Sequence, residues 1–204
     1  ENAKQIAQGD EGMQAEWQAN SALNLYRMDA EEYLGVRIED MSTIAVRYDV
    51  EEIKDAPDLR QYYASRGQEQ LARQVLFHHT RAMRQQMEYI HNMVNTQAPG
   101  YGAEYGCGSA PVSFELALRG HRIDFIDIDG CGAYEFTKWR ATKRGVDCGF
   151  ALIGPYDYVL MLDSIEHIAD WQGALTQVIG ALKEKGALIT NYFGNQDYNN
   201  PEHI

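Results

Sequence analysis

The sequence has few of the features that mark secreted, membrane or nucleic-acid-binding proteins. Its 204 residues include only 3 cysteines, which form no Cys-x-x-Cys pair, so neither a disulfide framework nor a zinc site is predicted. No run of Lys or Arg offsets the net charge of −12, which disfavours nucleic acid as a partner. No apolar stretch approaches the roughly 20 residues needed to span a bilayer. We therefore expect a cytoplasmic protein with no membrane partner, no nucleic-acid partner and no metal site.

Proline is also scarce, and the composition is that of a globular protein. The chain is 45% hydrophobic and holds 5 Pro and 18 Gly, which is enough to bury one sizeable core and excludes a disordered or fibrous class. Its character changes near Ala98-Pro99-Gly100. We interpret residues 1–98 as a mainly helical N-terminal cap and residues 99–204 as the core domain.

The first part carries a helical rhythm. Apolar residues recur at three- and four-residue spacing from about Asp58 to Gln97, which predicts one long helix or two helices broken near Gly67. A weaker helical pattern runs from Met13 to Tyr26. Between them, Ser42 to Tyr48 alternates and is rich in branched residues, so a short strand is predicted there.

The second part alternates between strand and helix patterns. Strands are predicted at Tyr101–Tyr105, Arg122–Asp127, Tyr158–Leu162 and Ala187–Phe193, with a weak one near Val146–Leu152. Helices are predicted at Pro111–Arg119, Tyr134–Arg144 and Trp171–Leu182, and Gly145 suits a helix C-cap. This order predicts an α/β fold: a doubly wound, mainly parallel Rossmann-like sheet behind an N-terminal helical extension.

The segment from Glu104 to Pro111 lies between a predicted strand and a predicted helix. Gly106 and Gly108 allow the backbone to approach a ligand closely, and the following helix presents unpaired N–H groups. Asp127 lies 21 positions after Gly106 (127 − 106), at the end of the next strand. An acidic residue there can accept hydrogen bonds from ribose hydroxyls, so a nucleoside cofactor is predicted.

Four motifs stand in order at Glu104–Ala110, Phe125–Asp129, Tyr156–Ile168 and Leu182–Ile189. Together they resemble the motifs of the class I S-adenosylmethionine-dependent methyltransferases, especially small-molecule O-methyltransferases of the ubiquinone-biosynthesis type. The resemblance covers about residues 101–204 and implies an enzyme that uses S-adenosylmethionine. It makes residues 99–204 the cofactor-binding methyltransferase core. The low basic content then favours a small-molecule methyl acceptor.

The resemblance and the strand ends together give a set of candidate site residues. The candidates for cofactor binding are Glu104, Gly106, Cys107, Gly108, Asp127, Ile128, Asp163 and Ser164. Asp127 is preferred to Asp129 because it closes the apolar strand, and Ser164 has a helix-capping role as its alternative. His167 is the candidate catalytic base, with a packed helix histidine as the alternative.

The chain departs from the family pattern in two places. No acidic residue in Val146–Pro155 has the position of the one that meets the adenine amino group, so apolar and backbone contacts are expected to hold the adenine. After Ala187–Phe193, too few residues remain for the usual last two strands, so the sheet is expected to lack them. We expect the natural protein to continue beyond Ile204, or Ser42–Tyr48 to cover the bare sheet edge.

Two other functions are compatible with parts of the sequence. The chain is alternatively a non-catalytic cofactor-binding or interaction domain of a larger protein, which would bind cofactor without transferring a methyl group. A nicotinamide-dependent dehydrogenase is less favoured, because Gly106–Pro111 lacks the final glycine of the dinucleotide fingerprint.

Overall fold

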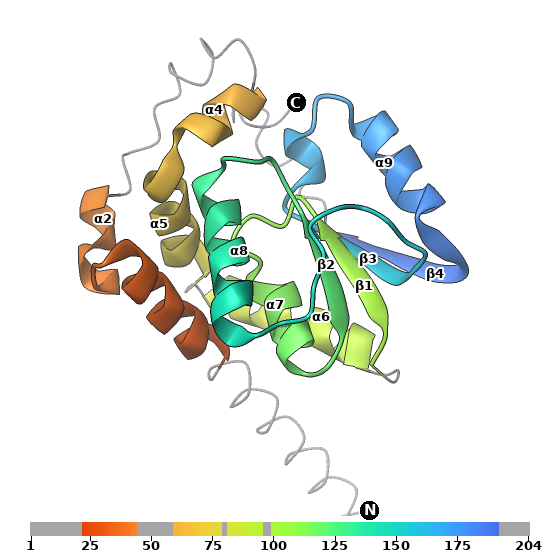
Figure 1. Ribbon diagram of the computed structural model, residues 1–204, viewed down its shortest axis with the longest axis horizontal. Coiled ribbons are helices and arrows are strands. Elements are labelled where there is room, and N and C mark those ends of the chain that lie inside the picture. Colours follow the sequence, from red (N-terminus) through yellow and green to blue (C-terminus); the bar gives the residue numbers. More distant parts are fainter. Residues whose placement is uncertain (1–21, 45–58, 79–80, 96–98, 192–204) are drawn as a thin grey trace, which may run out of the picture.

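A four-stranded parallel sheet forms the centre of the protein (Figure 1). The computed structural model describes residues 22–44, 59–78, 81–95 and 99–191. The strands, in the spatial order β2-β1-β3-β4, are β1 (Tyr101–Tyr105), β2 (Arg122–Ile126), β3 (Tyr156–Leu162) and β4 (Leu182–Asn191). Every neighbouring pair is parallel. The predicted Rossmann-like α/β class is confirmed.

Helices cover both faces of the sheet, because side chains along each strand point alternately to opposite sides. In β3, Tyr158 and Leu160 belong to the larger of two buried clusters, and Val159 and Met161 belong to the smaller one. The larger cluster lies under the helix of residues 22–34, α5 (Gly67–His78), α6 (Arg81–Asn95), α7 (Pro111–Leu118) and α8 (Gly132–Arg144). The smaller cluster lies under α9 (Trp171–Gly180), which stands apart from α7 and α8 in Figure 1.

The segment between α8 and β3 is not a strand, so the weak strand predicted near Val146–Leu152 is wrong. Gly145 ends α8 in a left-handed conformation, as predicted. Beyond it, Gly149 O accepts from Phe125 N at 3.0 Å, but Gly149 N donates to the Asp124 carboxylate at 2.7 Å. Because a side chain takes this donor, the segment runs beside β2 without forming a ladder.

The last strand begins earlier than predicted. Leu182 already pairs with Tyr156, whereas Ala187 pairs with Tyr158, so Lys183–Gly186 form an irregularity inside β4. Helix α9 correspondingly ends at Gly180 instead of Leu182. Within the described part of the chain, β4 is the last strand and lies at the edge of the sheet. This agrees with the predicted lack of the last two family strands.

The N-terminal helical pattern is divided more finely than predicted. The structure holds α4 (Leu59–Ser65), α5 and α6, with one break at Gly67, whose φ is +50°. Residues 22–34 are helical, which agrees with the prediction up to Tyr26 and extends it to Leu34, whereas Met13 lies outside the described residues. The predicted strand at Ser42–Tyr48 is wrong where it is described. After a turn of 3-10 helix at Ile38–Asp40, α2 (Met41–Ile44) takes its place.

Helix α5 packs closely on α8. Leu71 and Val75 of α5 are fully buried. A Cβ added at Gly132, the first residue of α8, would lie 1.7 Å from the carbonyl oxygen of Gly67. Only glycine therefore allows the two helices to approach at this point.

Replacing Gly132 by alanine is expected to lower the free energy of unfolding by about 1–3 kcal/mol, because the new methyl group forces α5 away from α8. Urea unfolding would measure the change. Gly180→Ala is the matched control, since a Cβ there meets nothing within 4 Å. We expect that control to be neutral or slightly stabilising. Equal effects of the two variants would contradict the close approach.

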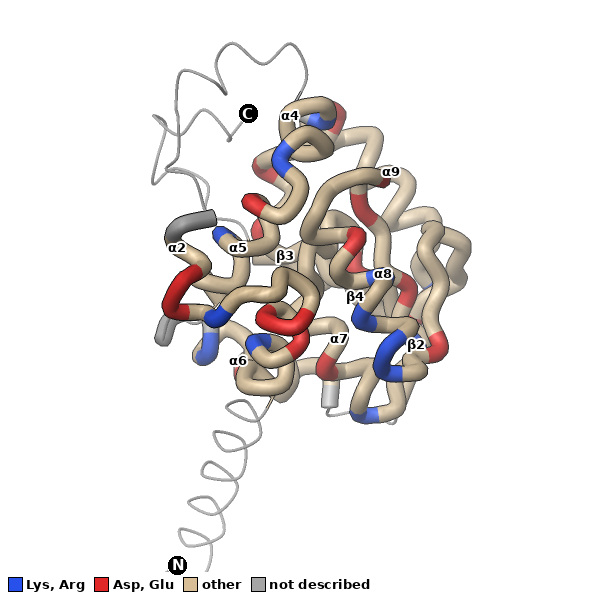
Figure 2. The backbone as a smooth tube through the Cα atoms, turned by 60° about the vertical axis from the view of Figure 1, so that its left-hand side comes forward, with Lys and Arg blue, Asp and Glu red and all other residues tan. Residues whose placement is uncertain are grey.

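Charged residues are distributed over the molecule. In the view of Figure 2, Lys and Arg positions are interspersed with Asp and Glu positions. Among the described residues, no helix is long and apolar enough to cross a membrane.

Candidate cofactor site

The glycine-rich turn after β1 is held in an unusual backbone conformation. Gly106, Gly108 and Ala110 have φ values of +74°, +49° and +49°. Left-handed backbone is unfavourable for alanine, so the surrounding bonds must hold the turn in place. Gly106 N and Cys107 N both donate to Ile126 O, at 2.8 and 3.1 Å, and Ala110 N donates to Cys107 O at 2.7 Å. The turn is thereby fixed between the carboxyl ends of β1 and β2.

Ser164, after β3, packs against this turn. A Cβ added at Gly106 would lie 2.5 Å from the Cβ of Ser164, so the close approach requires glycine. Ser164 Oγ donates to Tyr105 O at 3.2 Å. The side chain makes no capping hydrogen bond to the short 3-10 helix of Ile165–His167. The structure therefore does not support the alternative that the Ser164 side chain caps this helix.

Asp127 bonds the turn directly. Its Oδ2 accepts from Gly108 N and its Oδ1 accepts from Ile128 N, both at 2.6 Å. Burial raises the pKa of the Asp127 carboxyl, and the hydrogen bonds from Ile128 and Gly108 partly offset this effect. The carboxylate thus links the end of β2 to the turn after β1.

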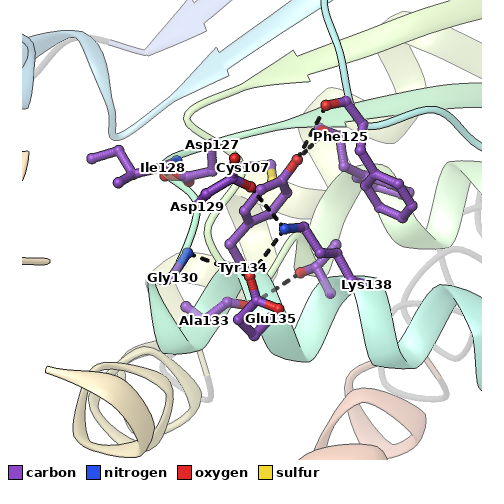
Figure 3. A network of polar contacts seen from close by, with 12 residues as sticks. Cys107, Phe125, Asp127, Ile128, Asp129, Gly130, Ala133, Tyr134, Glu135 and Lys138 are labelled. Atoms are coloured by element: carbon purple, nitrogen blue, oxygen red, sulfur yellow. Dashed lines mark hydrogen bonds and ion pairs between the residues drawn. The ribbon is translucent and has the colours of Figure 1, made fainter. Parts of the chain in front are cut away.

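Asp129 has a different environment, as Figure 3 shows. Its side chain is 86% exposed and pairs with Lys138 Nζ at 2.8 Å. Lys138 also pairs with Glu135 at 2.9 Å and lies 4.2 Å from the centre of the Tyr134 ring. Asp129 thus forms an exposed ion pair with Lys138 of α8, and the choice of Asp127 over Asp129 as the ribose acceptor stays a prediction.

Glu104 is the most deeply buried acid of the site. It is 3% exposed and accepts a hydrogen bond from Ser113 Oγ of α7. Burial raises the pKa of Glu104 to about 8, the bond from Ser113 opposes the rise, and the nearby charges of Asp127 and Asp163 add to it. Three carboxylates therefore gather at the carboxyl ends of β1, β2 and β3.

Asp163 ends β3 in the left-handed region, with a φ of +46°. A reciprocal pair of bonds with Asn191 of β4 holds it there: Asp163 N donates to Asn191 Oδ1 at 2.7 Å, and Asn191 Nδ2 donates to Asp163 Oδ1 at 2.8 Å. Burial raises the pKa of Asp163, and the charge of Glu166 raises it further. The pair joins the ends of two adjacent strands.

His167 lies at the side of this site that faces the N-terminal helices. Its ring meets Tyr63 of α4 edge-on, with centroids 6.2 Å apart. The structure thus brings α4 beside His167.

The remaining candidates lie in the same region. Cys107 is buried in the turn, and burial raises the pKa of its thiol well above the usual range. Ile128 is half-buried and supplies a main-chain donor to Asp127. Within the described residues, no group of three or more His, Cys, Asp or Glu side chains is placed to hold a metal ion.

Sequence reasoning missed the residues that reach the turn from elsewhere. Gln74 of α5 accepts from Ser109 N, and Tyr26 shares a 2.8 Å hydrogen bond with Ser109 Oγ. Both precede the turn by more than thirty residues, and neither stands in a recognisable motif. No local signal could have identified them.

Comparison with known proteins places this geometry in a family. A family model described as a methyltransferase domain matches residues 76–202, which is more than half of the chain. The chain belongs to this methyltransferase-domain family. The resemblance to class I S-adenosylmethionine-dependent methyltransferases is thereby confirmed, whereas the closer comparison with ubiquinone-biosynthesis enzymes stays a prediction. No curated protein matches the chain significantly.

The solved structures that resemble part of this chain are distant from it in sequence. The N-methyltransferase NodS from Bradyrhizobium japonicum, solved with S-adenosyl-L-homocysteine, is 19% identical with a TM-score of 0.48, over 55% of this chain and 62% of that one. A putative sarcosine dimethylglycine methyltransferase from Galdieria sulphuraria is 17% identical with a TM-score of 0.48, over 53% and 47%. The protein PH0226 from Pyrococcus horikoshii is 22% identical with a TM-score of 0.44, over 55% and 58%. The chain thus covers less than two thirds of each.

Proposed function

We propose that this methyltransferase domain binds S-adenosylmethionine and transfers its methyl group to a small-molecule acceptor. The observation that carries the proposal is the Asp127 carboxylate bonded to Gly108 N of the turn at 2.6 Å. The site also fits the cofactor chemically. Gly106 and Gly108 let the backbone of the turn lie directly against Ser164 and Gln74, and the nearby acids suit a ligand with ribose hydroxyls and cationic sulfonium and ammonium groups.

The proposed roles follow from these positions. Asp127 would accept from the ribose hydroxyls, with Ile128 beside it. Glu104 and Asp163 would face the cationic part of the cofactor, and Ser164 and Cys107 would support the turn. S-adenosylmethionine supplies an electrophilic methyl group on a sulfonium. The protein's task is to align the acceptor with that methyl group and to exclude water, and positioning alone supplies effective molarities of about 10⁵ M or more.

A proton must be removed only from an acceptor that is protonated before the transfer. His167 is the proposed base for that case, because the short 3-10 helix that holds it, Ile165–His167, follows the carboxyl end of β3. Residues 1–98 are proposed to form the helical cap over this edge of the sheet, and residues 99–204 the cofactor-binding core. A cytoplasmic location and the exclusion of nucleic acid stay predictions.

A second function follows from the incomplete match in length. A domain that binds cofactor without catalysing transfer would serve as an interaction module, and it would release no S-adenosylhomocysteine in the presence of any acceptor.

Calorimetry with S-adenosylmethionine, S-adenosylhomocysteine and NAD separates the methyltransferase from the dehydrogenase alternative. We expect the first two ligands to bind and NAD not to bind.

Asp127→Ala is expected to weaken binding of S-adenosylhomocysteine by about tenfold or more, because each hydrogen bond to a charged group contributes about 1.5–3 kcal/mol. Isothermal calorimetry measures the change, and urea unfolding reports whether the variant is folded. Asp129→Ala is the matched control, since Asp129 is exposed and pairs with Lys138. Unchanged affinity in a folded Asp127→Ala protein, or equal losses in both variants, would contradict the proposal.

A further inference from the structure

The side chain of Gln74 lies on the glycine-rich turn, although it comes from α5. Its Oε1 accepts a hydrogen bond from Ser109 N at 2.9 Å. A Cβ added at Gly108 would lie 2.8 Å from both Oε1 and Nε2 of Gln74. The amide therefore packs directly against the backbone of Gly108, in the turn where the proposed function places the cofactor.

The position of Gln74 is imposed by the helix that carries it. Gly67, at the start of α5, touches Gly132 of α8. At its other end, His78 shares a 3.3 Å hydrogen bond with Tyr26, whose hydroxyl also bonds Ser109 Oγ. Positions 67, 74 and 78 are spaced by seven and four residues, so they share one face of the helix. This face is fixed over the turn on both sides of Gln74.

Two of the turn's N–H groups differ from the rest. Those of Gly106 and Cys107 donate to a main-chain carbonyl, and so does that of Ala110. In contrast, Gly108 N and Ser109 N donate to the side chains of Asp127 and Gln74. The turn is therefore bounded by a carboxylate on one side and by an amide on the other.

These two boundaries suit different parts of one ligand. Asp127 suits the ribose, which carries adenine on C1′ and the amino-acid chain on C5′. The buried acids Glu104 and Asp163 suit the cationic groups of that chain, so Gln74, across Gly108, is assigned to its end, which holds a carboxylate and an ammonium. A glutamine amide offers two N–H donors and one carbonyl acceptor, so it can hold Ser109 N through its oxygen while its nitrogen donates to a carboxylate.

We propose that Gln74 binds the amino-acid end of the cofactor, with Nε2 donating to its carboxylate and Oε1 keeping the bond from Ser109 N. The inference rests on the proposed function and adds a residue that positions the cofactor from outside the sheet. It also explains why α5 must approach α8 so closely at Gly132. A helix held further away would not bring a side chain of this length to Gly108.

The test compares two ligands that differ only at the group in question. 5′-Methylthioadenosine keeps the adenosine and the thioether of S-adenosylhomocysteine but has no amino-acid end. By calorimetry, Gln74→Ala is expected to weaken binding of S-adenosylhomocysteine about tenfold and to change binding of 5′-methylthioadenosine less than about twofold. Gln74→Glu keeps an acceptor for Ser109 N but repels the ligand's carboxylate. It is therefore expected to weaken binding of S-adenosylhomocysteine at least as much as Gln74→Ala does, and to leave binding of 5′-methylthioadenosine unchanged.

Controls separate this role from a structural one. Gln85→Ala removes the same amide from an exposed position on α6 and is expected to change neither affinity. Gln74→Met keeps the side-chain length without the amide and replaces the alanine variant if that protein does not fold. If Gln74→Ala weakens binding of both ligands equally, or of neither, the proposed role of Gln74 is wrong and the proposed function is unaffected. Failure of the unmodified protein to bind either ligand would overturn the proposed function, and this inference with it.

Discussion

Asp29→Ala is expected to lower the free energy of unfolding by about 3–5 kcal/mol, because it leaves a buried guanidinium without its counter-charge. Asp29 is fully buried in the helix of residues 22–34 and pairs with Arg140 at 3.0 Å, Lys143 at 3.0 Å and Arg144 at 2.5 Å. Arg140 is itself 2% exposed and lies 3.9 Å from the centre of the Phe114 ring. Lys143 and Arg144 reach water, whereas Arg140 does not.

Urea unfolding at neutral pH measures this effect, and Glu32→Ala is its matched control. Glu32 pairs only at the surface, with Lys143, so its removal is expected to change stability by less than about 1 kcal/mol. The double variant Asp29→Leu with Arg140→Met removes both buried charges and is expected to recover much of the loss. Similar losses of stability in Asp29→Ala and Glu32→Ala would contradict the role of the buried charge.

The Asp29 effect is also expected to depend on pH. Burial raises the pKa of Asp29, but the hydrogen bonds from Arg144, Arg140 and Lys143 outweigh it and hold the pKa below its usual 3.8. A carboxyl with a lowered pKa in the folded state stabilises the protein above its unfolded pKa. This contribution disappears as pH falls through the folded value. The difference between Asp29→Ala and the unmodified protein should therefore shrink in acid.

Glu104→Gln is expected to stabilise the ligand-free protein at high pH. Burial raises the pKa of Glu104 from 4.5 to about 8, so between these values the folded state holds a proton that the unfolded state has lost. Stability from this group is complete below pH 4.5 and is lost as pH rises through 8. The difference between the two pKa values corresponds to at most about 5 kcal/mol of stability. Glu104→Gln cannot ionise, so it does not lose this stability at high pH.

Urea unfolding of both proteins at pH 5 and pH 9 tests this expectation. The two stabilities should be similar at pH 5, and the variant should be the more stable protein at pH 9. Glu184→Gln, at an exposed position of β4, should show no such divergence. Parallel pH dependence of Glu104→Gln and the unmodified protein would show that Glu104 ionises as freely in the folded state as in the unfolded one.

The same variant links stability to binding under the proposed function. A cationic cofactor favours the ionised form of Glu104, so the affinity for S-adenosylmethionine should rise as pH increases toward 8. In Glu104→Gln this rise should be absent, and affinity at pH 8 and above should be lower than in the unmodified protein. The acid that destabilises the ligand-free fold would then be the one that the cofactor requires.

The sequence by itself determined the sheet and the position of the turn. Strand β3 is mostly an apolar run and β1 and β2 are short segments with buried centres, and the glycine-rich turn directly follows β1, so the local pattern was enough to predict these three strands. Asp127 and Asp163 could be proposed for the same reason, since each stands at the end of a strand. Parallel strands bring their carboxyl ends to one edge, and no further information was needed to group these acids.

Only the tertiary structure decided what surrounds that edge. Ser42–Ile44 alternate like a strand yet are helical. Val146–Leu152 form no strand, because Gly149 N donates its hydrogen bond to the Asp124 carboxylate. The bond from Ser109 to Gln74 joins residues 35 positions apart, and the pair of Arg140 with Asp29 spans 111. Such contacts depend on how α5 and the helix of residues 22–34 pack on α8. Packing is set by shape and charge across the whole core, which local spacing does not encode.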